Sequence, residues 1–172
     1  MACDRALLVD LDGTLTDNFQ GIARSIRHAL AALGAPEPDD GELYSCVGPP
    51  LRDSFARLLA TNDTALVERA IVRYRERYAD IGWQENTVYD GVESALAALA
   101  ARGEVLYLCT SKPLPYAEKI VAHFRLRSYL TRAYGADLAG TLDDKATLIA
   151  HLVRCEGLDV GGCVSSATAS TM

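Results

Sequence analysis

The sequence has no long apolar run and no concentration of positive charge. The apolar run before Asp10, ALLV, is only four residues long, too short for a secretory signal, and no stretch approaches the length that crosses a bilayer. The net charge is -6 and the pI is about 5.0. Because phosphate backbones and anionic lipids attract clustered basic residues, we expect neither nucleic acid nor a membrane as a partner. A cytoplasmic location is the resulting expectation.

The sequence has few cysteines, and they form no paired motif. The five cysteines are odd in number and contain no CxxC pair, which argues against a disulfide framework or a zinc site and favours reduced thiols. Repeats and low-complexity tracts are also absent. With 172 residues, of which 49% are hydrophobic and 23% charged, the chain can form one compact core plus an insert.

The periodicity of apolar residues changes along the chain. Residues 6–9, ALLV, are typical of a strand buried on both faces, as in a parallel sheet. Residues 19–82 carry helical spacing and helix-ending signals throughout. From Val88 the pattern alternates: a helix over 91–103, a strand over 105–109, and a helix over 113–125.

Two further elements complete this alternation. A short strand is expected around RAYGA, and the last helix over 143–157, with Asp143 as N-cap and Gly157 as its stop. The fold class is therefore α/β with a parallel sheet. We expect a discontinuous core, residues 1–16 and 88–172, interrupted by a helical segment over 17–87.

Two acidic residues, Asp10 and Asp12, follow directly on the first predicted strand. If Leu11 points into the core, both carboxylates can face one crevice, and Gly13 lets the chain turn. Close carboxylates repel each other, so a Mg²⁺ ion between them is the expected cofactor. A simple strand-ending turn is the alternative. An EF-hand calcium loop is excluded, because Leu15 and Gly21 stand where that loop needs glycine and glutamate.

The stretch LLVDLDGTLTD resembles the first motif of the haloacid dehalogenase superfamily of phosphohydrolases. The resemblance implies that Asp10 is the nucleophile that forms an aspartyl-phosphate, that Asp12 is the general acid and base, and that both bind Mg²⁺. VLYLCTSKP resembles the second motif and implies that Thr110 and Ser111 bind phosphate. DDKATLIAHL resembles the third motif, whose lysine is Lys145, in the first turn of a helix where the dipole also attracts an anion.

The helical segment is similar to the cap of one branch of this superfamily. VGPPLRDSF and YRERYADIGWQENTVYDGV resemble the phosphoglycolate phosphatases and 5'-nucleotidase-like hydrolases. The implied architecture is a Rossmann-like core with an α-helical cap that selects the substrate. Gly48 and Arg52 become candidate substrate contacts, with a plain surface role for Arg52 as the alternative.

A second phosphatase pattern, C-x5-R, spans residues 46–52. The loop of cysteine-dependent tyrosine phosphatases aims successive backbone N–H groups at the phosphate, and Pro49 and Pro50 have none to offer. We therefore reject this reading. Activity that needs no Mg²⁺ and is sensitive to thiol alkylation would reinstate it.

The fourth motif of the superfamily, an acidic loop after an apolar strand, is expected near Cys163, where the chain reads CVSSATASTM. If the serines use TCN codons, a shifted frame can spell Val-Ile-Gly-Asp-Arg-Val-Asp-Asp. We interpret residues 165–172 as a truncated or frameshifted form of that motif, an idea that AGC or AGT serine codons would contradict. Weak or no turnover from these residues alone is the resulting expectation.

The sequence thus predicts Mg²⁺-dependent hydrolysis of a small phosphate monoester through an aspartyl-phosphate. The alternative is a catalytically impaired remnant that binds phosphate or a partner and lacks the fourth motif. The identity of the ester and the oligomeric state are not readable from these residues.

Overall fold

The computed structural model describes residues 6–137, 142 and 144–159, and the backbone of 164–167. Contacts divide the chain into two units. Unit 1 comprises residues up to Asp17 and those from Val88 onward, and unit 2 comprises Asn18–Thr87. A two-stranded sheet of β2 (Thr16–Asp17) and β3 (Thr87–Val88) marks the two points where the chain passes from one unit to the other.

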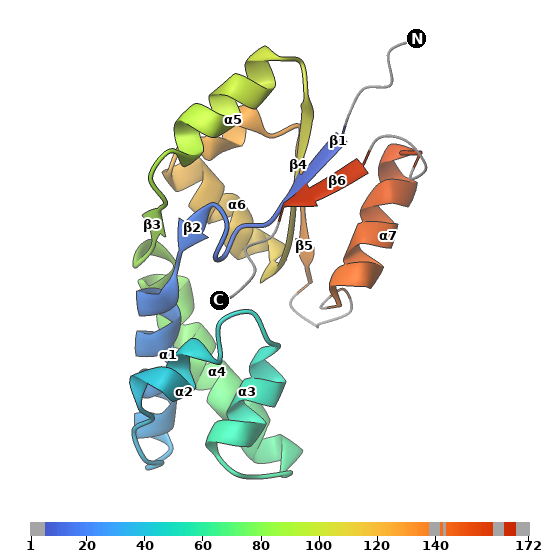
Figure 1. Cartoon of the computed structure of the whole chain (residues 1–172). Coiled ribbons are helices and arrows are strands. Elements are labelled where there is room, and N and C mark those ends of the chain that lie inside the picture. Colours follow the sequence, from blue (N-terminus) through green and yellow to red (C-terminus); the bar gives the residue numbers. More distant parts are fainter. Residues whose placement is uncertain (1–5, 138–141, 143, 160–163, 168–172) are drawn as a thin grey trace. The chain divides into compact units, whose positions relative to one another are not determined.

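Unit 1 is built on a four-stranded parallel sheet with the order β5-β4-β1-β6 (Figure 1). Its strands are β1 (Ala6–Val9), β4 (Val105–Pro113), β5 (Arg132–Ala136) and β6 (Val164–Ala167). The predicted α/β class with a Rossmann-like parallel sheet is confirmed. β4 is four residues longer than the predicted strand over 105–109, so Thr110 lies within the strand and not after it.

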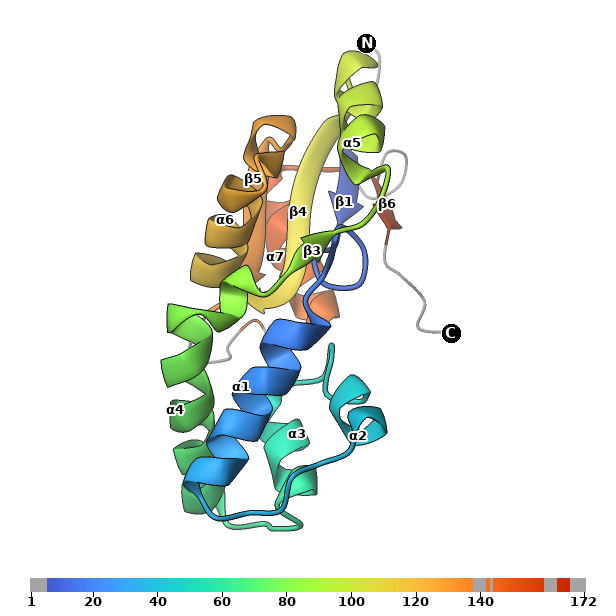
Figure 2. The same ribbon diagram turned by 90° about the vertical axis from the view of Figure 1, so that its left-hand side faces the viewer.

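Helices lie on both faces of this sheet. α5 (Val92–Ala101) and α6 (Leu114–His123) lie on one side and α7 (Lys145–Glu156) on the other, as Figures 1 and 2 both show. A short 3-10 helix, η2 (Leu126–Tyr129), precedes β5. Parallel strands need such crossover connections. Because helices cover both faces of the sheet, β1 and the first part of β4 are apolar.

The core on the α7 side of the sheet comes from alternate residues of three strands. It contains Ala6, Leu8, Tyr107, Cys109 and Tyr134, and Leu148 and Leu152 of α7 pack against them. Leu148 and Leu152 are spaced one helical turn apart, so both face the sheet. Burying these two leucines stabilises the docked helix by about 1.5 to 3 kcal/mol each.

α7 begins one residue later than predicted, and its N-cap is Asp144 instead of Asp143, which lies outside the described residues. The Asp144 carboxylate accepts hydrogen bonds from the backbone N–H and the hydroxyl of Thr147, at 2.7 and 2.8 Å. A side chain three residues before a free N–H is the geometry a cap requires. These bonds hold the pKa of Asp144 below its usual value. The predicted stop at Gly157 is confirmed.

The other end of α7 is fixed to the sheet by one carboxylate. Glu156 accepts hydrogen bonds from Tyr107 of β4, at 3.0 Å, and from Tyr134 of β5, and it pairs with Arg132 at 2.7 Å. These groups lower the pKa of Glu156, the hydrogen bond from Tyr134 having the largest effect. α7 is therefore anchored at both ends, with Lys145 at its first position.

Unit 2 is helical. It contains α1 (Phe19–Ala32), α2 (Asp40–Tyr44), α3 (Leu51–Leu58) and α4 (Thr64–Asp80), followed by a 3-10 turn, η1 (Gly82–Gln84). Helical structure was expected throughout 19–82, but the short helix α2 was not singled out. α2 begins with a capping box, in which Asp39 and Glu42 satisfy each other's backbone N–H groups.

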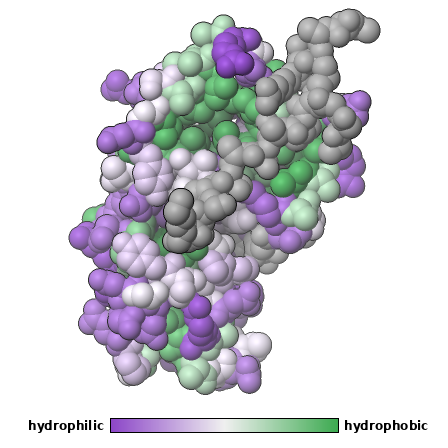
Figure 3. All heavy atoms as spheres, in the orientation of Figure 1, coloured by the Kyte–Doolittle hydropathy of each residue, from purple (hydrophilic) through white to green (hydrophobic). Residues whose placement is uncertain are grey.

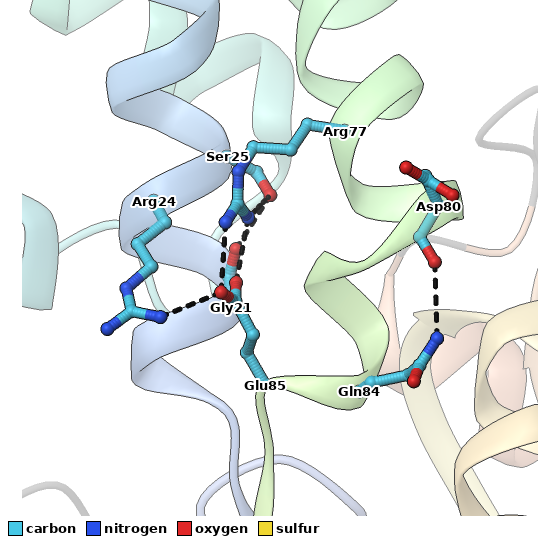
Figure 4. A network of polar contacts seen from close by, with 7 residues as sticks. All are labelled: Gly21, Arg24, Ser25, Arg77, Asp80, Gln84 and Glu85. Carbon is cyan, nitrogen blue, oxygen red and sulfur yellow. Dashed lines mark hydrogen bonds and ion pairs between the residues drawn. The ribbon is translucent and has the colours of Figure 1, made fainter.

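α1, α4 and the turn after α4 are joined by one polar network (Figure 4). Glu85 accepts from Arg24 at 2.7 Å and from both terminal nitrogens of Arg77 at 2.7 and 2.9 Å. Backbones also approach closely here: a Cβ on Gly21 would lie 2.1 Å from the carbonyl oxygen of Gly82. Gly21 is therefore required, because the opposing atom belongs to the backbone and cannot move aside.

We expect this network to make unit 2 less stable in acid. The hydrogen bond from Arg77, opposed by burial and aided by Arg24, holds the pKa of Glu85 below its ordinary 4.5. A carboxylate with a depressed folded pKa stabilises the fold above its unfolded pKa, and that contribution disappears as the pH falls through the folded value. Glu85→Gln should cost about 1 kcal/mol of unfolding free energy at pH 7, and the gap to wild type should shrink below pH 4.5.

Urea unfolding at pH 7 and at pH 3.5 measures this gap. Glu76→Gln is the matched control, because Glu76 forms an exposed pair with Arg73 and its loss should change little at either pH. A gap for Glu85→Gln that is equal at both pH values would contradict the assignment.

The surface of unit 2 carries many charged groups. Figure 3 shows hydrophilic residues over much of the face in view. Arg27 and Arg73 of unit 2 form ion pairs with Glu37 and Glu76. Among the described residues, no helix combines the length and the apolar composition that a membrane span requires.

Candidate active site

The loop after β1 is folded around the carbonyl oxygen of Leu11. That oxygen accepts from the backbone N–H groups of Thr14, Leu15 and Thr16 at 3.2, 2.9 and 3.0 Å. The Leu11 side chain is fully buried, as predicted, and Gly13 has a φ of +74°, which a side chain would strain. This tight turn holds Asp10 and Asp12 at the carboxyl end of β1.

Asp10 is held by two groups. Its Oδ1 accepts from the backbone N–H of Leu11 at 2.8 Å, and its Oδ2 pairs with Nζ of Lys145 at 2.7 Å. The same ammonium donates to the carbonyl oxygen of Cys109, the residue before Thr110, at 2.6 Å. Lys145 thus joins the residue after β1 and the middle of β4 to the start of α7. The sequence placed Lys145 in the first turn of this helix, and it is the first residue of α7.

Thr110 and Ser111 continue β4 beyond this contact. Val9 of β1 is in register with Leu108 of β4, so the residues that follow each are neighbours at the same edge of the sheet. Thr110 is buried, and its Oγ1 accepts from the backbone N–H of Lys112 at 3.2 Å. Ser111 is half-buried. The predicted phosphate-binding hydroxyls therefore lie on the strand that Lys145 contacts.

Lys112 was missed by the sequence analysis. Its Nζ pairs with Oδ2 of Asp12 at 2.7 Å, and its side chain is only 5% exposed. The signal was present in the letters TSKP, but an exposed lysine is so common after a strand that the residue alone carried little information. Two lysines and two aspartates thus form two ion pairs in unit 1, Lys145 with Asp10 and Lys112 with Asp12.

The site alters the acidity of two neighbouring groups. Burial raises the pKa of the Cys109 thiol, the positive charge of Lys145 opposes that rise, and Asp10 adds to it. Cys109 is therefore a neutral core thiol and not a nucleophile. Burial, with the charges of Asp17 and Asp12, raises the pKa of Tyr89.

The donor set suits a hard divalent cation. Mg²⁺ takes oxygen ligands and is bound through one or two carboxylates together with water and substrate phosphate, and Asp10 and Asp12 supply two carboxylates one residue apart. Within the described residues, no three His, Cys, Asp or Glu side chains gather as a metal-binding group. Among the described residues, the side chains that would hold such an ion are those of Asp10 and Asp12.

Gly48 and Arg52 belong to unit 2. Gly48 has a φ of +102°, in the loop before α3, and Arg52, in the first turn of α3, forms an exposed ion pair with Glu68. Their predicted contact with substrate is not tested by this geometry. In the C-x5-R stretch, the Cys46 thiol is buried and accepts from Arg57, at 3.3 Å, and not from Arg52.

The segment interpreted as a frameshifted fourth motif lies mostly outside the described residues. The backbone of Val164–Ala167 forms β6, parallel to β1, with Ala6 opposite Val164. The interpretation of residues 165–172 stays a prediction.

Comparison with known proteins gives several relatives. The chain is 44% identical over 158 residues to a 5'-nucleotidase of Pseudomonas aeruginosa, covering 92% of this chain and 71% of that protein. It is 39% identical to the tyrosine-protein kinase PtkA of Mycobacterium tuberculosis, over 84% of this chain and about half (49%) of the kinase. A phosphoglycolate phosphatase of Cupriavidus necator is 31% identical, with 90% of this chain and 68% of that protein covered.

A solved structure and a family model agree with these relatives. The crystal structure of a predicted phosphatase from Clostridium acetobutylicum matches with a TM-score of 0.88 and 33% identity, over 96% of this chain and 76% of that one. The family model described as haloacid dehalogenase-like hydrolase matches residues 7–154, which include Asp10, Asp12, Lys112 and Lys145. The resemblance drawn from the three motifs is confirmed: this chain belongs to the haloacid dehalogenase-like hydrolases and is an enzyme of their phosphatase type.

Proposed function

We propose that the protein hydrolyses a small phosphate monoester in a Mg²⁺-dependent reaction through an aspartyl-phosphate on Asp10. The observation that carries the proposal is the 2.7 Å contact between Lys145 and Asp10, made where β1, β4 and the N-terminus of α7 meet. An ammonium and a helix N-terminus at one carboxylate supply positive charge where a phosphate would bring negative charge. The relatives, a 5'-nucleotidase and a phosphoglycolate phosphatase, support the substrate class.

The residues divide the chemistry between them. A carboxylate oxygen of Asp10 attacks phosphorus, and the bond from phosphorus to the ester oxygen breaks while Asp12 transfers its proton to that oxygen. Asp12 then removes a proton from water, which attacks the aspartyl-phosphate and releases inorganic phosphate. Mg²⁺ held by Asp10 and Asp12 would neutralise the charge of the phosphate and keep the Asp10 nucleophile ionised. Lys145, Thr110 and Ser111 bind the phosphate oxygens.

Unit 2 is proposed to act as the cap that selects the ester. Its Gly48 and Arg52 are the candidate contacts for the part of the substrate beyond the phosphate. Because Arg52 is engaged with Glu68 in unit 2, contact with a substrate would require it to leave or share that pair.

A catalytically impaired remnant that binds phosphate or a partner is the second candidate. The observation that favours it is the lack of a third acidic ligand among the described residues. Both candidates predict phosphate binding at Lys145, but only the first predicts turnover.

Hydrolysis of p-nitrophenyl phosphate, phosphoglycolate and a nucleoside monophosphate by the full chain separates the two candidates. We expect phosphate release with Mg²⁺ and its loss on chelation with EDTA, restored by added Mg²⁺. Release that is unaffected by EDTA would contradict the proposal, and phosphate binding with no release from any ester would establish the remnant.

A further inference from the structure

The side chain of Lys112 is buried, which is rare for a lysine. The ammonium is 2.7 Å from Oδ2 of Asp12, and its side chain is 5% exposed, whereas Asp12 is 18% exposed. Lysine is almost never buried this far without a charged partner, because removing an ammonium from water is costly. The carboxylate of Asp12 is a charged partner of this kind for Lys112 within unit 1.

The composition of the chain makes this placement more specific. The sequence holds three lysines, at 112, 119 and 145, against fourteen arginines that make up the rest of the 17 basic residues. Two of the three lysines contact the two aspartates of the site. Lys119 is exposed on α6. Lysine offers a compact point charge on a flexible stem, whereas the guanidinium of arginine is planar and rigid.

The backbone of β4 is shaped to deliver this side chain. The pairing of β4 with β5 shifts register between Thr110 and Pro113, so the strand is irregular at Lys112. Such irregularities re-aim side chains and recur beside active sites. On the neighbouring strand, a Cβ at Gly135 would lie 2.7 Å from the carbonyl oxygen of Lys112, so the two backbones approach there as only glycine permits.

We propose that Lys112 is a positioning residue for the proton transfer made by Asp12. It acts through Asp12: its ammonium holds Oδ2 of that carboxylate, which fixes the orientation of the side chain toward the ester oxygen. The inference rests on the proposed function, in which Asp12 donates the proton to the leaving group. Lys112 thus differs in role from Lys145, which is 30% exposed and binds the Asp10 carboxylate.

This role can be tested with two substrates, because their leaving groups differ in whether they need a proton. Nitrophenolate departs without protonation, whereas the alkoxide released from phosphoglycolate needs a proton from Asp12. For Lys112→Met we expect kcat/KM to fall about 10- to 100-fold with phosphoglycolate but to stay within about threefold with p-nitrophenyl phosphate. The parameter kcat/KM is chosen because it reports the steps up to transfer of phosphorus to Asp10.

Other roles for Lys112 give different patterns. If Lys112 binds the phosphate, kcat/KM falls equally with both substrates, and the proposal is wrong. If Lys112 only supports the fold, kcat/KM falls with both substrates together with the unfolding free energy, and the proposal is again wrong. Lys112→Arg keeps the positive charge and should recover part of the loss with phosphoglycolate. Lys119→Met is the matched control and should change neither rate.

Asp12→Asn separates failure of this inference from failure of the proposed function. Asp12→Asn must itself show the selective loss with phosphoglycolate, and adding Lys112→Met to it should cause no further selective loss. Selectivity in Asp12→Asn without selectivity in Lys112→Met would overturn the role of Lys112 alone. No selectivity in Asp12→Asn, or no turnover by the wild type, would overturn the assigned proton transfer and the inference with it.

Discussion

Replacing Asp10 with asparagine should reduce phosphate ester hydrolysis by at least about 10³-fold, the scale on which loss of a catalytic nucleophile acts. Asparagine keeps the shape of the side chain and can still accept from the backbone N–H of Leu11, a 2.8 Å bond in the wild type. It has no carboxylate to attack phosphorus. The fold is therefore retained while the aspartyl-phosphate cannot form.

Two measurements check this result. Steady-state release of phosphate gives the rate, and hydroxylamine trapping of the acid-quenched enzyme gives the amount of acyl-phosphate, which should be present in the wild type and absent in Asp10→Asn. Asp90→Asn, a change at an exposed aspartate of unit 1, serves as the control and should leave both unchanged. A trapped acyl-phosphate in Asp10→Asn would show that another carboxylate is the nucleophile.

Lys145→Met should have the second largest effect, a fall of about 10²- to 10³-fold in kcat/KM, comparable to the loss of one donor that stabilises a developing negative charge. Methionine preserves most of the volume of the lysine stem but removes the ammonium that contacts Asp10 and the Cys109 carbonyl. The phosphate then meets Asp10 with less compensating charge. Binding of orthovanadate, measured directly by isothermal titration calorimetry, should weaken as well.

The vanadate measurement keeps this prediction independent of turnover. A chain that binds phosphate without hydrolysing it would still lose vanadate affinity in Lys145→Met. Unchanged vanadate affinity, with the unfolding free energy also unchanged, would show that Lys145 does not face the phosphate. Lys119→Met again provides a lysine of the same chain outside the site.

The sequence predicted the strand β1, the turn after it and the place of Lys145 because each depends on local signals. An apolar tetrapeptide, a glycine after two aspartates and a helix start are all readable within about ten residues. Lys112 was not predictable in this way. Its burial depends on an irregularity in the pairing of β4 with β5 and on the lack of a Cβ at Gly135, a residue of the next strand. Both properties depend on β5, which does not adjoin Lys112 in the chain.

The prediction of the N-cap of α7 was wrong by one residue, for a local reason. Asp143 and Asp144 are adjacent aspartates, and the residue type suits both to capping, so the letters alone do not select the one that bonds to Thr147. The contacts of Arg52 could not be predicted for a similar reason. The sequence does not distinguish an arginine that binds substrate from one on the surface, and the pairing of Arg52 with Glu68 depends on how α3 packs against α4.

The pairing of Asp10 with Lys145 spans 135 positions of the chain. During synthesis from the N-terminus, the aspartate leaves the ribosome long before its counter-charge does, and α7 must be complete before the ammonium can dock. Asp10 therefore acquires its cationic neighbour only after α7 has been made, so a nascent chain that has folded no further than β5 carries the aspartate without this charge pair.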